Sequence, residues 1–113
     1  MSERGSEVVV VAIVEVLPGH GDRLTERFST VIEGSHTEEG CLTYALHRDR
    51  TNPDRFVLVE RWRSQEDLDA HFSQPHMDAV SGLADSIAGA PEVVFCEPVP
   101  FGEPGKNFAG SGE

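Results

Sequence analysis

The chain has 113 residues, with 9 Lys and Arg against 20 Asp and Glu, for a formal net charge of -11. This length suits one domain built around a single hydrophobic core. The negative charge argues against nucleic acid and acidic membrane surfaces as partners, because both would repel the protein. A neutral or weakly acidic small molecule fits the charge better.

The N-terminal region and the cysteines indicate the compartment. The apolar run Val8 to Val14 is too short to span a bilayer, and the residues around it lack the basic region and cleavage site of a signal peptide. The expected compartment is therefore the cytoplasm. Cys41 and Cys96 lie far apart and form no metal-spaced motif. In a reducing compartment both are expected to be small apolar strand residues without a disulfide.

The first half of the chain predicts a strand, a helix and a pair of strands. Residues Glu7 to Leu17, almost unbroken in Val, Ala and Ile, predict a strand buried on both faces. A helix is expected from about Asp22 to Ser35, and strands from about Cys41 to Arg48 and about Arg55 to Arg63, joined by a turn that contains Asn52-Pro53. The apolar stripe of the helix consists of Leu24, Phe28, Val31 and Ile32.

The second half predicts a broken helix, a strand and a tail. Ser64 with Asp67 resembles a capping box and predicts a helix start, while Pro75 suits the first turn of a further helix. Glu92 to Pro98 is expected to be the last strand, so residues 1–98 form the domain. Residues 99–113, rich in Pro, Gly and Ser, are expected to be a tail that is disordered or draped over a neighbour. The inward-facing apolar residues of the two helices are Leu68, Phe72, Met77, Val80, Leu83, Ala84 and Ile87.

The element order β-α-β-β-α-β is that of a ferredoxin-like α+β fold, with an antiparallel four-stranded sheet covered by helices on one face. The third strand alternates between two sets of residues, and both sets are largely apolar. Helices can cover only one face, so an exposed apolar face predicts a homodimer packed sheet to sheet, with a cavity where helices, sheet and partner meet. The two sets are Phe56, Leu58, Glu60 and Trp62 on one side and Val57, Val59 and Arg61 on the other.

Three residues of the strand pair are candidates for a pocket. Glu60 lies among apolar groups, where burial would raise its pKa toward that of a useful general base. Alternatively, Glu60 pairs with an arginine, Arg48 or Arg61, or lies at a wet rim. Trp62 is either core or a wall for a flat aromatic substrate, and Tyr44 either packs in the core or hydrogen-bonds a ligand.

The histidines form a second group of candidates. His71 and His76 place two bases beside the break between the helices. Asp67 could orient the His71 ring or simply form an exposed helical pair with it. The helix start disfavours a charged His76, so a neutral imidazole there could accept a proton. His47 is expected to be a strand-end hydrogen bonder, and His20 and His36 surface residues.

The sequence shows no motif for a metal site, a nucleotide cofactor or a catalytic nucleophile. The histidines and carboxylates lack a recognisable ligand spacing, so no metal is expected. There is no Gly-rich nucleotide fingerprint and no Ser or Cys nucleophile motif, so no flavin or NAD is expected either.

Together these residues resemble the antibiotic biosynthesis monooxygenase family, small dimeric α/β-barrel proteins, over about Val8 to Pro98. The resemblance implies a ferredoxin-like protomer whose homodimer closes its sheets face to face. The best-known members oxygenate electron-rich phenols with O2 and without metal or flavin. The segments that carry the resemblance are Glu39-Gly40-Cys41-Leu42-x-Tyr44, His47-Arg48-Asp49, Phe56-x-Leu58-x-Glu60-x-Trp62 and Leu68-x-x-His71-x-x-x-Pro75-His76.

The resemblance also implies roles for the site residues. His71 or His76 would be the base, and Glu60 would orient a base or a substrate hydroxyl. The substrate-binding residues would be Tyr44, Leu58, Trp62 and Phe72.

Haem degradation, a further activity in the family, is not expected. Haem-degrading relatives place an aromatic residue where His71 stands. They place a haem-ligating histidine where this chain has Ser81, and an asparagine where it has Ala12.

The expected function is therefore that of a cofactor-independent monooxygenase that oxidises a small quinol, phenol or anthrone with O2. Two alternatives stay open: an isomerase of a small oxygenated metabolite, and a non-catalytic dimeric small-molecule binder.

Overall fold

The computed structural model describes residues 7–107 of the chain. The strands end slightly earlier than expected, β1 at Glu15 and β4 at Cys96. Apart from these ends, the elements follow the predicted order closely. They are β1 (Val8–Glu15), α1 (Gly21–His36), β2 (Cys41–Arg48), β3 (Arg55–Trp62), α2 (Gln65–His71), the 3₁₀ helix η2 (Pro75–Ser86), β4 (Glu92–Cys96) and α3 (Pro104–Asn107).

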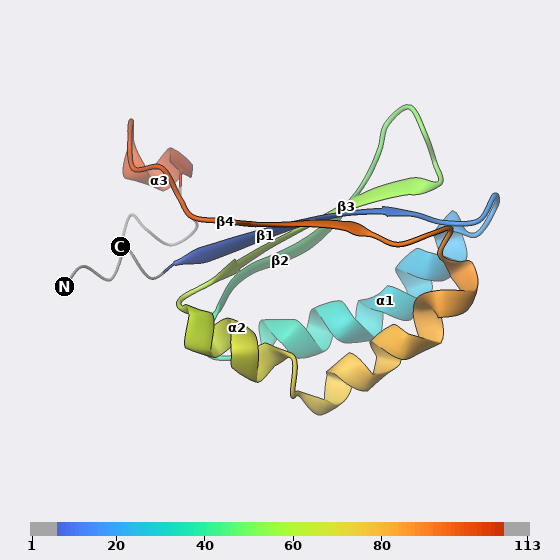
Figure 1. Cartoon of the computed structure of the whole chain (residues 1–113), viewed down its shortest axis with the longest axis horizontal. Helices are drawn as coiled ribbons and strands as arrows, with labels where there is room; N and C mark the ends of the chain where they lie inside the picture. The colour runs from blue at the N-terminus through green and yellow to red at the C-terminus, as the bar shows by residue number, and fades with distance from the viewer. Residues whose placement is uncertain (1–6, 108–113) are drawn as a thin grey trace.

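The four strands form one antiparallel sheet in the order β2-β3-β1-β4. Helices α1, α2 and η2 all lie against one face of this sheet; among residues 7–107, the other face is open except near α3 (Figure 1). This arrangement confirms the ferredoxin-like α+β prediction.

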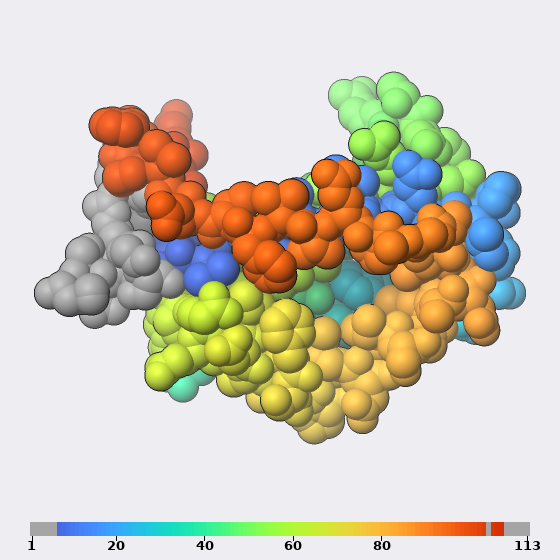
Figure 2. Space-filling model, viewed as in Figure 1, coloured from blue at the N-terminus to red at the C-terminus, as the bar shows by residue number. Residues whose placement is uncertain are grey.

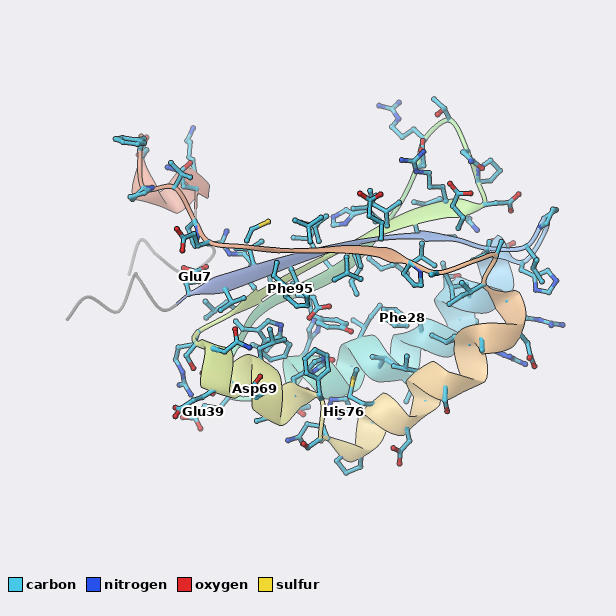
Figure 3. All side chains as sticks on the ribbon, in the orientation of Figure 1. Glu7, Phe28, Glu39, Asp69, His76 and Phe95 are labelled. Carbon is cyan, nitrogen blue, oxygen red and sulfur yellow. The ribbon has the colours of Figure 1, made fainter. Side chains whose placement is uncertain are left out.

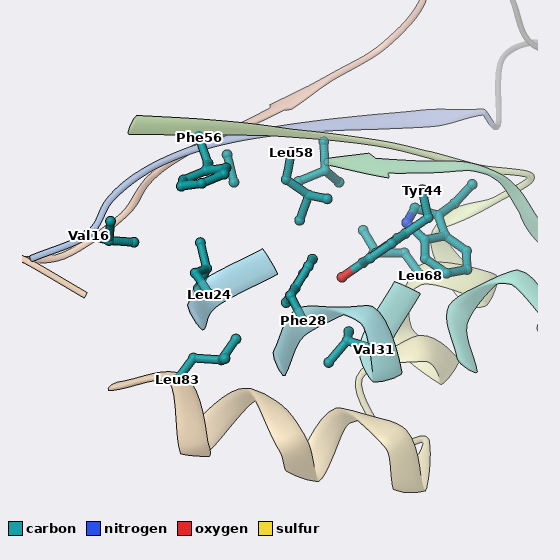
Figure 4. Packing of buried hydrophobic residues seen from close by; sticks show 12 residues of the cluster. Val16, Leu24, Phe28, Val31, Tyr44, Phe56, Leu58, Leu68 and Leu83 are labelled. Atoms are coloured by element: carbon teal, nitrogen blue, oxygen red, sulfur yellow. The ribbon is translucent and has the colours of Figure 1, made fainter. Parts of the chain in front are cut away.

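The strand register builds rows of side chains on the helix-covered face. One row places Tyr44 opposite Glu60, Glu60 opposite Val10, and Val10 opposite Phe95. Against these rows pack Leu24, Phe28 and Val31 of α1, as Figure 4 shows. The predicted shared face of β3 is confirmed. Its four residues, Phe56, Leu58, Glu60 and Trp62, are all buried.

One strand is irregular, and one prediction about strand burial is wrong. Regular alternation along β2 would place Leu42 on the face of Tyr44, but the register shifts between Cys41 and Thr43, and Leu42 is 40% exposed. The first strand was expected to be buried on both faces. Instead Val10 is buried under the helices, while Val11 on the open face is only partly buried, because no helix of the described part of the chain covers Val11.

The segment after Pro75 also differs from the prediction. It is a 3₁₀ helix with three residues per turn, so the residues that line the cavity recur every third position, at Met77, Val80 and Leu83, although Val80 is 37% exposed. Ala84 falls outside this series and is exposed, although α-helical spacing had placed it inside.

The described part of the tail folds back over its own chain. It contains the short helix α3, and the Asn107 carbonyl accepts a hydrogen bond of 2.9 Å from Arg61 Nη1 on the open side of the sheet. Of the two alternatives expected for the tail, disorder does not hold for residues 104–107, and draping over a neighbour stays a prediction; residues 108–113 lie outside the described part.

Two smaller findings complete the fold. Cys41 and Cys96 are free thiols, as expected. No helix within residues 7–107 combines the length and the apolar character needed to cross a bilayer.

Candidate functional site

An apolar cavity of about 200 Å³ lies between the sheet and helices α1 and η2. Its mouth corresponds to the hollow between β4 and η2 in Figure 2. Tyr44 and Glu60 are the polar side chains among the lining residues. The apolar lining includes Ala12, Leu46, Leu58 and Val93 from the sheet and Leu24, Phe28, Met77 and Leu83 from the helices.

Glu60 is the carboxylate of this cavity and is only 7% exposed. Its Oε1 accepts a hydrogen bond of 2.9 Å from Trp62 Nε1, two residues along the same strand face. The ion pairs found within residues 7–107 for the two expected arginine partners are with other carboxylates: Arg48 pairs with Asp22 and Arg61 with Glu7. Burial raises the pKa of Glu60, and the Trp62 hydrogen bond and the nearby His71 charge offset this only in part.

Tyr44 lies beside Glu60 in the same row of the sheet. Its ring stacks on Phe28 with the ring centroids 6.1 Å apart, as Figure 4 shows. Burial, and then the Glu60 charge, raise the pKa of the Tyr44 hydroxyl. The hydroxyl therefore stays protonated near neutral pH and can donate a hydrogen bond.

The other residues predicted to bind substrate divide between the cavity and its surroundings. Leu58 lines the cavity, whereas Trp62 and Phe72 are not among the lining residues. Trp62 is fully buried behind the cavity, with its ring 4.5 Å from the His71 ring. Phe72 follows the last residue of α2, where the chain turns outward, and it is 58% exposed.

The two predicted histidines meet at a residue that the sequence did not single out, Glu38. Its Oε2 accepts a hydrogen bond of 2.8 Å from His71 Nδ1 and one of 2.6 Å from His76 Nε2. The side chains are 1% exposed for His71, 9% for Glu38 and 15% for His76. Figure 3 shows His76 where α2 gives way to η2.

Asp67 does not orient His71, contrary to one of the two expectations. Its carboxylate binds Arg63 Nε at 2.8 Å and accepts a hydrogen bond from Ser64 Oγ. These contacts, led by the Arg63 hydrogen bond, lower the pKa of Asp67. The imidazole of His71 is held by Glu38, which lies 33 residues earlier in the chain.

One local signal hints at the position of the His76 ring. Gly34 lies in α1 two residues before its end, and a Cβ there would collide with the imidazole of His76. A glycine inside an otherwise regular amphipathic helix is the only sequence feature that points to this close approach. No comparable feature marks Glu38.

The remaining histidines lie apart from this cluster. His47, on the open face, hydrogen-bonds the Val57 carbonyl at 3.2 Å, as expected for a strand-end residue. His20 contacts the Ser86 hydroxyl, and His36 contacts the Tyr44 carbonyl. The site therefore has two acid–base parts: Glu60 facing the cavity, and the Glu38–His71–His76 cluster behind Tyr44 and Trp62.

Residues 7–82 match the family described as antibiotic biosynthesis monooxygenase. The chain belongs to this family. The probable quinol monooxygenase YgiN of Escherichia coli strain K12 is 32% identical over 84 residues, which cover 66% of this chain and 81% of YgiN.

Two further relatives extend the comparison. The uncharacterized protein sll1783 of Synechocystis is 31% identical over 87 residues; they cover 76% of this chain but only 59% of sll1783. The solved structure of Rv0793 from Mycobacterium tuberculosis aligns with a TM-score of 0.78 at 25% identity, covering 87% of this chain and 100% of that one. The architecture described above is thus shared with the solved structure of Rv0793.

Proposed function

We propose that this protein is a cofactor-independent monooxygenase that oxidises a small electron-rich aromatic, of the quinol, phenol or anthrone type, with O2. The observation that carries the proposal is Glu60, a buried carboxylate that faces an apolar cavity. Membership of the antibiotic biosynthesis monooxygenase family, and similarity to a protein named as a probable quinol monooxygenase, support the substrate class.

The size of the cavity favours a single-ring substrate. A dry apolar cavity of about 150 Å³ is enough to hold benzene, and this cavity measures about 200 Å³. Its apolar walls would bind the ring, while Glu60 and Tyr44 would bind the hydroxyl groups.

The proposed chemistry begins with proton removal. The Glu60 carboxylate accepts the proton of a substrate hydroxyl, which makes the ring a better electron donor to O2. For a hydroquinone, one oxygen atom of O2 enters the ring to give a hydroxybenzoquinone, and the other leaves as water. The Trp62 N–H keeps the carboxylate oriented, and the neutral Tyr44 hydroxyl can donate a hydrogen bond to the substrate.

In this mechanism the histidines act behind the cavity. His71 lies between Glu38 and the rings of Tyr44 and Trp62, and its charge favours the ionised form of Glu60. We assign His71 and His76 the role of positioning residues that tune Glu60, in place of the base role that the family resemblance implied.

We also propose that the protein works as a homodimer. Val11, Val59 and Ala45 form an apolar row across the open face of the sheet. Val94 of β4 pairs with Val11, extends this row on the same face and is 46% exposed. A second copy that packs on the open face would remove this apolar surface from water.

A second candidate function is isomerisation of a small oxygenated metabolite. The Glu38–His71–His76 cluster supports it, because a carboxylate between two imidazoles can pass protons without O2. The stoichiometry of O2 consumption separates the two reactions.

The decisive experiment is O2 uptake by metal-stripped, flavin-free protein with a panel of hydroquinones and anthrones, corrected for autoxidation. We expect Glu60→Gln to lower the enzyme-dependent rate by about 100-fold or more, because the amide can still accept the Trp62 hydrogen bond but cannot take a proton. Glu26→Gln, at an exposed residue of α1 away from the cavity and the open face, is the matched control and should retain the wild-type rate. Uptake no faster than autoxidation across the panel, or full activity in Glu60→Gln, would contradict the proposal.

A further inference from the structure

We propose that Glu38, His71 and His76 form a binding site for a divalent transition-metal ion of the Zn²⁺ type. The site lies where the loop after α1 meets the last residue of α2 and the first turn of η2 (Figure 3). It is separate from the apolar cavity, and it does not depend on the proposed oxygenase function.

The donor atoms are of the right kind and close together. Glu38 Oε2, His71 Nδ1 and His76 Nε2 all lie within 4.8 Å of one another, and no other such group occurs within residues 7–107. Two imidazoles and one carboxylate are a donor set of catalytic zinc sites, with bonds of about 2.0–2.1 Å. Donors around such an ion lie about 3.3 Å apart. The two oxygen–nitrogen distances of 2.8 and 2.6 Å therefore need only a small spreading to admit the ion.

The charge balance of the cluster favours a cation. Within the described part of the chain, the ion pairs of Glu38 are those with His71 and His76, and these carry charge only when protonated. A nearly buried carboxylate without a permanent cation is costly. A metal ion would neutralise the Glu38 carboxylate and bind the two neutral imidazole rings. Each ring would first lose the proton on the nitrogen that faces Glu38, either to solvent or to its other nitrogen.

The surroundings hold the rings in place before an ion arrives. The His71 ring lies 4.5 Å from Trp62 and 5.4 Å from Tyr44. The His76 ring packs on α1 at Gly34, where only a glycine leaves space for it. Such fixed orientation lowers the cost of assembling the ligands.

A polar pocket gives the site an entry path. The pocket measures about 290 Å³ and lies beside Glu38. It has room for the water that completes the coordination of a three-ligand site. Its walls include Thr37, Gly40, Asp67, Ala70 and Gln74.

The test is calorimetric titration of the metal-stripped full chain with Zn²⁺ near neutral pH, together with the visible absorption spectrum of added Co²⁺. We expect one equivalent of Zn²⁺ and a Co²⁺ spectrum of low coordination number. Glu38→Gln and His76→Gln should each weaken Zn²⁺ binding by about 100-fold or more, because each removes a direct ligand. Substituting a residue that only hydrogen-bonds a ligand already lowers metal affinity by about 10–100-fold. The matched controls Glu26→Gln and His47→Gln alter exposed residues outside the ligand set and the entry pocket, and should bind as the wild type does.

Two results would overturn the proposal: no stoichiometric Zn²⁺ binding to the wild type, or equal affinity in Glu38→Gln. Circular dichroism verifies that each variant is folded, and the wild-type titration and Co²⁺ spectrum remain decisive if a variant is not. Because O2 uptake is measured on metal-stripped protein, the metal site and the oxygenase function can fail independently of each other.

Discussion

At the residue scale, the pairing of Glu60 with Trp62 explains how this sheet tolerates a buried carboxylate. The two side chains lie two positions apart on β3, so they share a face, and the indole N–H donates directly to the carboxylate. The Trp62 hydrogen bond satisfies one carboxylate oxygen of Glu60, but the indole carries no positive charge that could balance the carboxylate. Burial therefore still raises the pKa of Glu60. A strand that looks like core by composition thereby presents one reactive group to the cavity.

Cys41 provides a residue-scale prediction. Burial, followed by the charges of Glu38 and Glu60, raises the pKa of its thiol to about 11. A raised pKa leaves less of the reactive thiolate, roughly one molecule in a thousand at about pH 8. In a Cys96→Ser variant, we expect iodoacetamide to label Cys41 about 100-fold more slowly than an ordinary free thiol.

The control for this labelling is the same variant unfolded in urea, where the thiol should react at the ordinary rate. Equally fast labelling of the folded and unfolded protein would show that Cys41 is not protected as described.

At the element scale, the short helix α2 matters because its last residue is His71. Ser64 caps the helix by accepting a hydrogen bond of 3.2 Å from the Asp67 N–H. Pro75 then starts η2, and Gln74 before it is extended, as a residue before proline prefers. The cap and the proline together set where the two histidines point.

Removing the cap should destabilise the protein. We expect Ser64→Ala to lower the free energy of unfolding by about 1 kcal/mol, because the Asp67 N–H loses its partner. Urea unfolding followed by circular dichroism measures the change. Ser29→Ala is the matched control. The Ser29 hydroxyl bonds a carbonyl within α1 and is exposed, so its loss should change the free energy by less than about 0.5 kcal/mol. Equal effects of the two substitutions would contradict the capping role.

At the scale of the whole molecule, the two faces of the sheet differ in what covers them. Helices α1, α2 and η2 bury one face, whereas in the described residues 7–107 the other face has only the short α3 near one end (Figure 1). The apolar row of Val11, Val59 and Ala45 remains partly exposed there. This asymmetry is the physical basis of the homodimer proposal.

The dimer proposal predicts a mass in solution of about 25 kDa, twice the 12.3 kDa of the chain. A charged side chain at the centre of the open face would be buried without a partner in the dimer interface. Because burying an unpaired charge is costly, the protein should then have the mass of a monomer. We expect this for Val59→Lys in light scattering coupled to gel filtration. Leu17→Lys, at an apolar residue outside the sheet, should leave the dimer intact. A wild-type protein of monomer mass would refute the proposal.

The sequence by itself determined the features that depend on local periodicity. Alternation along β3 predicted the shared face of Phe56, Leu58, Glu60 and Trp62, and a side chain's face is set by the backbone pleat alone. The Ser64 cap and the break at Pro75 were likewise predicted, because they follow from the hydrogen bonds and dihedral angles of adjacent residues.

Only the tertiary structure decided which distant side chains meet. Glu38 binds His71 and His76 across 33 and 38 residues, and no local pattern encodes that contact. Phe72 is likewise exposed at the end of α2 because of packing between elements, whereas the pairing of Asp67 with Arg63, four residues earlier, is a local contact. Side chains at helix ends and in loops take their directions from packing between elements, so periodicity predicted the candidates for the site but not their partners.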